Sequence, residues 1–232
     1  MISSQYQCIF IHIPKSAGQS IEHLFLKLHG LTWKSRSQLL LRENKIPDMG
    51  PSRLAHRYAN EYIKHGYVNQ ENYEKYYKFS FVRNPWSRLV SEYKYRNHQN
   101  KFSFKEFVLH NLPEQGMSDE YRHIVPQYDF LYSDNGHLMV NFIGKFETLQ
   151  EDFNIVAKNL NLPIANLPIA NLPHINKSHQ SGVKGRLHKI ITQLKSTNKP
   201  SSSNYREYYS DDLRKTVSKM YEKDIDIFKY TF

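Results

Sequence analysis

The chain has 232 residues, 39% of them hydrophobic, and carries a net charge of +10 at neutral pH. This length can bury one sizeable core, and no linker divides it, so we expect a single domain over residues 1–232. The positive charge implies an anionic partner: a polyphosphorylated cofactor, an acidic polysaccharide, a nucleic acid or a membrane surface. Because Lys and Arg are dispersed and form no long basic run, we expect no nucleic-acid partner.

Cysteine and histidine usage narrows the chemistry further. The one cysteine, Cys8, excludes an intramolecular disulfide and is expected in the core. The twelve histidines form no His-Glu-x-x-His motif, so a metal site lacks support from the sequence. The early apolar run is too short to span a bilayer and is interrupted by His12. We therefore expect a cytoplasmic protein with no membrane span.

The first predicted element is a buried strand that leads through a polar loop into a helix. Residues 8–13 form an apolar run, broken only by His12, that is typical of a buried parallel strand. After the loop, apolar residues follow a helical period and end at Gly30. They are Ile21, Leu24, Phe25 and Leu28. Unpaired amides at the helix start, the charge of Lys15 and the close backbone approach allowed by Gly18 favour a bound phosphate.

This loop is not a Walker A sequence, because its lysine opens the loop instead of closing it. The alternative interpretation is a tight turn with a solvated lysine.

A second strand, turn and helix follow. Residues 79–83 (Phe-Ser-Phe-Val-Arg) predict a buried strand that Asn84 and Pro85 end. The next apolar residues repeat the helical spacing: Trp86, Leu89, Val90 and Tyr93. Arg83 at the strand end and Ser91 in the helix are both predicted to face one crevice above the sheet. The alternative interpretation is that Arg83 pairs with a nearby carboxylate and that Ser91 only caps or packs.

The remaining chain adds a third strand and a long connection. We expect strands at residues 7–13, 78–83 and 138–146, and a capping box between Thr148 and Glu151 at the start of the next helix. The residues predicted to line that helix are Leu149, Phe153, Val156 and Leu160. The repeated Asn-Leu-Pro-Ile-Ala unit from Asn161 predicts an extended surface connection without chemistry.

The order of these motifs resembles that of the PAPS-dependent sulfotransferases. Pro-Lys-Ser-Ala-Gly-Gln-Ser at 14–20 is similar to the family's 5′-phosphosulfate loop, and Phe-Val-Arg-Asn-Pro-Trp-Ser-Arg-Leu-Val-Ser at 81–91 to its 3′-phosphate motif. Gly-Lys-Phe-Glu-Thr-Leu at 144–149 resembles the carbohydrate branch, as do residues 172–178, 205–209 and 224–232. The resemblance implies a three-layer, P-loop-like α/β fold with a mostly parallel sheet flanked by helices.

The resemblance also implies a set of binding residues. The co-substrate would be PAPS and the product PAP, with no metal required. The residues expected to bind the nucleotide are Lys15, Ser16, Ala17, Gly18, Gln19, Ser20, Arg83 and Ser91. Lys184 and Arg186, in a basic stretch late in the chain, could cover the 3′-phosphate, although a solvated loop is an equally good interpretation.

Two residues are expected to carry the reaction. Lys15 would stabilise the negative charge that grows on the leaving phosphate. His56 lies between the two phosphate motifs, in a segment similar to the family's His-x-Thr-Ala-x-Glu, and is the predicted general base. Arg57 and Tyr58 depart from that pattern, so a packing role for His56 stays open. The acceptor is expected to contact residues 97–137.

Three functions remain open from the sequence. The first is sulfuryl transfer to a hydroxyl of a carbohydrate or glycan acceptor, as in polysaccharide sulfation. The second is a nucleotide kinase with a variant phosphate loop, which lacks the Gly-Lys-Ser/Thr ending and an evident acidic magnesium site. The third is a non-catalytic nucleotide- or polyanion-binding protein on the same scaffold.

Overall fold

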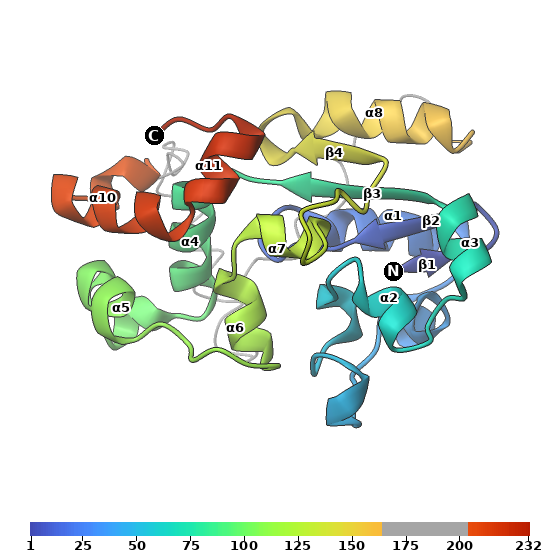
Figure 1. The fold of residues 1–232 in the computed structure, drawn as a ribbon, viewed down its shortest axis with the longest axis horizontal. Helices are drawn as coiled ribbons and strands as arrows, with labels where there is room; N and C mark the ends of the chain where they lie inside the picture. Colours follow the sequence, from blue (N-terminus) through green and yellow to red (C-terminus); the bar gives the residue numbers. More distant parts are fainter. Residues whose placement is uncertain (164–203) are drawn as a thin grey trace, which may run out of the picture.

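A computed structural model describes residues 1–163 and 204–232 (Figure 1). Its centre is a four-stranded sheet in the order β1-β2-β3-β4. β2 (Cys8–Ile11), β3 (Tyr77–Val82) and β4 (Phe142–Lys145) are parallel, and β1 (Ile2–Ser3) pairs antiparallel with β2. The predicted mostly parallel α/β sheet is confirmed. β2 and β4 are shorter than expected, β3 begins and ends one residue earlier, and β1 was not anticipated.

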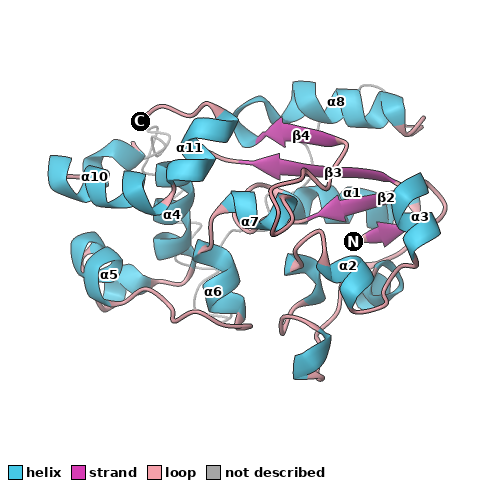
Figure 2. Cartoon of the chain, viewed as in Figure 1, coloured by secondary structure: helices cyan, strands magenta, loops and turns pink. Residues whose placement is uncertain are grey.

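Helices cover both faces of this sheet (Figure 2). Phe10, Phe79 and Phe81 point to the face where α1 (Gly18–Leu28) and α8 (Leu149–Asn159) pack. Ile9, Ile11 and Val82 point to the other face, where they join a larger core with α4 (Pro85–Tyr95). The period-two alternation of each strand therefore sorts its side chains between two helical layers.

The other helices of the described residues are short and stand mainly around the larger core. They are α2 (Glu61–Lys64), α3 (Gln70–Lys75), α5 (Phe104–His110), α6 (Asp119–Ile124), α7 (Gln127–Leu131), α10 (Asp211–Met220) and α11 (Glu222–Phe228). Within the described ranges, none is long and apolar enough to cross a membrane.

Local signals set the boundaries of the two helices that follow β2 and β3. Gly30 takes a left-handed φ of 65°, and the amides of Gly30 and Leu31 donate to the carbonyls of Lys27 and Leu26, which ends α1. Asn84 caps α4, because its side chain accepts from the Ser87 amide at 3.1 Å. The apolar stripes predicted for both helices are buried, except for the terminal Leu28, which is half-buried.

The start of α8 differs from the prediction. Thr148 and Glu151 form no capping box; the Thr148 hydroxyl donates instead to Asp152 at 2.7 Å. The Lys145 amide donates to the same carboxylate at 2.6 Å, so Asp152 joins the end of β4 to the helix. The repeat after Pro163 and the predicted phosphate contacts Lys184 and Arg186 lie outside the described residues.

Candidate active site

The loop between β2 and α1 forms a tight concave turn. Lys15 and Ala17 both adopt left-handed backbone angles, with φ of 69° and 65°, which are uncommon for residues other than glycine. Gly18 begins α1, where the first amides have no partner inside the helix. A Cβ on Gly18 would lie 1.9 Å from the His12 ring, so only glycine fits. The turn therefore presents helix-start amides at the end of a buried strand.

Ser16 contributes a buried hydroxyl that the protein itself does not use in a hydrogen bond. The residue is 1% exposed, and its hydroxyl oxygen has no hydrogen-bond partner. A buried hydroxyl is normally paired, because leaving it unpaired costs free energy. A phosphate or sulfate oxygen in the loop would accept from this hydroxyl, and the donor set therefore fits an anion.

Arg83 and Lys15 meet at the carboxyl edge of the sheet. The Arg83 guanidinium donates to the Lys15 carbonyl at 3.1 Å and, through two nitrogens, to the Ser87 hydroxyl at 3.1 and 2.8 Å. It also lies 4.3 Å from the centre of the Phe146 ring. Burial lowers the pKa of Arg83 to about 10, so the group stays charged at neutral pH. Ser91 lies half-buried on α4, and its phosphate contact stays a prediction.

Lys15 is held in a partly buried position. Its ammonium lies 3.7 Å over the Tyr95 ring, a cation–π contact. Burial lowers the pKa of Lys15 to about 8, against the opposing charge of Glu92. The lysine is therefore still mostly protonated at neutral pH, and close to its titration range.

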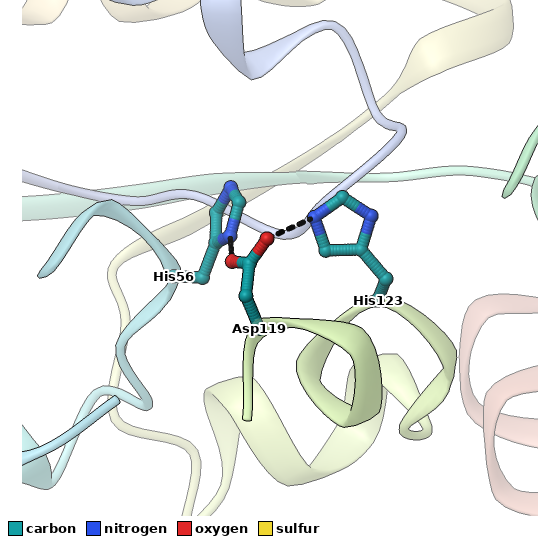
Figure 3. Close-up of side chains that lie close together, drawn as sticks. All are labelled: His56, Asp119 and His123. Carbon is teal, nitrogen blue, oxygen red and sulfur yellow. Dashed lines mark hydrogen bonds and ion pairs between the residues drawn. The ribbon is translucent and has the colours of Figure 1, made fainter. Parts of the chain in front are cut away.

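Three buried histidines surround this corner, and each pairs through Nδ1 with a carboxylate. His12 bonds Glu22 at 2.5 Å, His56 bonds Asp119 at 2.6 Å, and His123 bonds Glu92 at 2.6 Å. The His56 ring centre lies 4.7 Å from that of His12 and 4.9 Å from that of His123. Figure 3 shows Asp119 lying between His56 and His123. Of these three histidines, the sequence indicated only His56.

Burial decides the protonation of His56. The desolvation of His56 outweighs its hydrogen bond to Asp119 and lowers the pKa of His56 to about 3. Burial alone would raise the pKa of Asp119, but the contacts with His56, His123 and Arg53 hold that pKa below its usual range. At neutral pH, Nδ1–H of a neutral His56 therefore donates to ionised Asp119, and Nε2 keeps its lone pair.

His56, Asp119 and His123 are also close enough to share one metal ion, with candidate ligand atoms within 4.8 Å of one another. Positive charges oppose that use. Arg96 donates to Asp119 at 3.1 Å and to Glu92 at 2.6 Å, and Arg53 lies 3.7 Å from Asp119. Since the carboxylate already has two cationic neighbours, this group suits proton transfer better than metal binding.

Lys15 and His56 line the same cavity. Its wall also includes His12, Pro14, Ala17, Gly18, Gln19, Ser20, Arg53, Tyr95 and His123. A second cavity, of about 240 Å³, shares His12, Gln19, Arg53 and His56 with the first and adds Trp33, Arg36 and Arg42 among others. The structure thus places His56 beside the β2–α1 loop, where the second cavity adjoins the first at the four shared residues.

The chain belongs to the sulfotransferase family, whose model matches residues 1–231. An uncharacterised protein of Archaeoglobus fulgidus is 35% identical over 99 residues, which cover 41% of this chain and 77% of that protein. No solved structure matches the chain. The family resemblance inferred from the motifs is therefore confirmed, and it supports sulfuryl transfer as the activity.

Proposed function

We propose that this protein transfers the sulfuryl group of PAPS to a hydroxyl of a carbohydrate acceptor. The observation that carries this proposal is the shared cavity of Lys15 and His56, next to Arg83 on the adjoining strand end. Lys15 would neutralise the leaving phosphate, and His56 would accept the proton of the acceptor hydroxyl. Membership of the sulfotransferase family supports PAPS as the donor.

The two phosphate-bearing ends of the nucleotide would bind at the carboxyl ends of β2 and β3. The β2–α1 loop, with Ser16 and Lys15, suits the 5′-phosphosulfate, and Arg83 with Ser91 suits the 3′-phosphate. Ser87 holds the Arg83 fork in place before any ligand arrives. This preorganisation reduces the ordering that binding requires.

The transfer step needs a base and a stabilised leaving group. The acceptor oxygen forms a bond to sulfur, the bond between sulfur and the bridging phosphate oxygen breaks, and the acceptor proton moves to His56 Nε2. Lys15 stabilises the charge left on the phosphate. Asp119 fixes the His56 tautomer and stabilises the imidazolium that forms. The negative charge of bound PAPS raises the basicity of His56 from its buried, ligand-free value.

The second cavity supports a carbohydrate acceptor. Trp33, Arg36 and Arg42 contribute an indole edge and polar groups to its wall, and the indole is held by His23, which stacks on it with centres 4.7 Å apart, and by Arg36, which lies over it. Because this cavity shares His56 with the phosphate cavity, a hydroxyl bound there would lie near the base. The resemblance to the carbohydrate branch supports the same class of acceptor.

Two measurements test this function against its alternatives. Calorimetry with PAP and with magnesium-ATP separates a sulfotransferase from a kinase, which would prefer ATP. Glu22, Glu92 and Asp119, which pair with the three histidines at this corner, are already engaged in these bonds, which disfavours a magnesium site there. Transfer of labelled sulfate from PAPS to a glycan panel then tests catalysis. Tight PAP binding with no transfer to any glycan would favour the non-catalytic alternative.

A further inference from the structure

A larger cavity, of about 640 Å³, lies between α2, α6 and α7 and shares no residue with the two cavities at the phosphate loop. Its volume is within the range of small-molecule sites, about 300–1,000 Å³. Four tyrosines contribute to its wall: Tyr58, Tyr121, Tyr128 and Tyr132. The proposed chemistry at Lys15 and His56 uses none of them.

The tyrosines form fixed aromatic faces. Tyr128 and Tyr132 stack nearly parallel, with ring centres 4.3 Å apart and an angle of 11° between the rings. Tyr58 stands edge-on to Phe130, and Arg122 lies 3.6 Å over its ring. Lys223 lies 4.6 Å over the Tyr128 ring, so Tyr132, fixed by its stacking on Tyr128, is the ring that a flat apolar ligand face can bind with little loss of side-chain entropy.

Two buried polar atoms in the same wall have no partner. Arg122 is 1% exposed and donates through two nitrogens to Glu61, at 2.6 and 3.2 Å, but its Nε has no acceptor. The side-chain oxygen of Asn60 has no donor. Arg122 Nε needs a hydrogen-bond acceptor, and the Asn60 oxygen needs a donor. Hydroxyl groups of a ligand provide both.

The charges of this wall balance. Arg122 is paired with Glu61, and the two other cationic residues, Lys64 and Lys223, are matched by Asp129 and Asp134. The cavity therefore does not select an anion, in contrast to the cavity lined by Lys15 and His56. A neutral molecule with hydroxyl groups and an apolar ring face fits its aromatic wall, its unpaired polar atoms and its balanced charge.

We propose that this cavity binds an uncharged saccharide, as a subsite for sugar units of the acceptor other than the one that reacts; this subsite role rests on the function proposed above. Its walls come from the segments that hold the base. Asp119 on α6 bonds His56, and Arg122 on the same helix lines this cavity. Tyr58, also in the wall, follows His56 by two residues. Acceptor length would therefore affect reactivity.

Titration calorimetry of the full chain saturated with PAP tests the subsite directly. The probes are neutral tetrasaccharides of glucose, galactose and N-acetylglucosamine. We expect at least one to bind, Tyr132→Ala to weaken that binding tenfold or more, and added salt to leave it unchanged. Tyr6→Ala is the matched control, since Tyr6 is also a half-buried ring but packs on Phe25 and His29.

The outcomes separate this inference from the proposed function. Failure of all tetrasaccharides to bind, or equal binding by wild type and Tyr132→Ala, overturns the subsite whether or not sulfate is transferred. Saccharide binding that Tyr132→Ala weakens, in a protein that neither binds PAP nor transfers sulfate, keeps the site and overturns the activity. In an active enzyme, Tyr132→Ala should raise KM for a long acceptor and leave KM for a monosaccharide acceptor unchanged.

Discussion

Lys15 combines three properties at one residue: a left-handed backbone, a partly buried ammonium and a carbonyl bonded to Arg83. In the proposed mechanism, its charge stabilises the leaving phosphate. Replacing it with alanine should lower turnover about a hundred- to a thousand-fold, by comparison with the loss of one preorganised donor. The assay is sulfate transfer at saturating PAPS, with exposed Lys27→Ala as control. Near-normal turnover of Lys15→Ala would exclude this role.

The titration of Lys15 gives a second prediction. Its pKa is lowered to about 8 by burial, and an anion binds the protonated form. The affinity for PAP should therefore be highest below about pH 8 and decline above it, as the free lysine loses its proton. Calorimetry across this range measures the effect. Lys15→Arg should remove the decline near pH 8, because arginine stays protonated; an unchanged decline would assign it to another group.

His56 and its partner Asp119 act as a pair at the residue scale. His56→Ala should lower kcat by about 10² to 10⁴, the usual range for a general base, with little change in PAP affinity. Asp119→Asn should also lower kcat, because an amide does not hold the same tautomer. His110→Ala, at an exposed position, is the control. A loss below about fivefold for His56→Ala, with a large loss for His12→Ala or His123→Ala, would move the base to that residue.

At the scale of elements, the strand–loop–helix units were predictable because their signals are local. The apolar runs of β2 and β3, the helical stripes of α1 and α4, and Gly30 are all read within a few residues. β1 has only two residues, too few for a pattern. The Thr148 capping box was wrong because Asp152, one residue beyond Glu151, competes for the threonine hydroxyl.

The β2–α1 unit has one position that tolerates no side chain. In Gly18→Ala the new Cβ would meet the His12 ring at 1.9 Å, so either the ring or the start of α1 must move. We expect a loss of about 1–3 kcal/mol in the free energy of unfolding and strongly weakened PAP binding. Urea unfolding and calorimetry measure both. Gly116→Ala is the control, since its Cβ would meet nothing within 4 Å; equal behaviour of the two variants would contradict the tight fit.

At the scale of the whole molecule, tertiary structure assembles the site from distant segments. Lys15 and Arg83 were predictable because each follows a parallel strand, and the ends of such strands share one edge. The histidine–carboxylate pairs were not. His56 and Asp119 are 63 residues apart, and His123 and Glu92 are 31 apart. Neither separation follows a helical or strand period, so only the packing of α4, α6 and the Leu54–His56 turn shows the pairing.

These buried pairs should make the whole fold sensitive to acid. Burial lowers the pKa of His56 and His123, so below about pH 6.5 the unfolded chain takes up protons that the folded protein refuses. The carboxylates of Asp119, Glu22 and Glu92 also have lowered pKa values, despite their burial, and extend the loss to lower pH. The free energy of unfolding should fall by about 1.4 kcal/mol per pH unit for each such histidine.

Urea denaturation at a series of pH values from neutral to about pH 5 measures this slope. His56→Gln removes one titrating group, so its midpoint should change less with pH than that of the wild type, whereas His110→Gln should follow the wild type because His110 is exposed. Equal slopes for wild type and His56→Gln would mean that His56 takes up its proton in the folded state. The folded-state pKa of His56 would then be close to that of a free histidine, about 6.5, and His56 could act as a base at pH 7 without the help of bound PAPS.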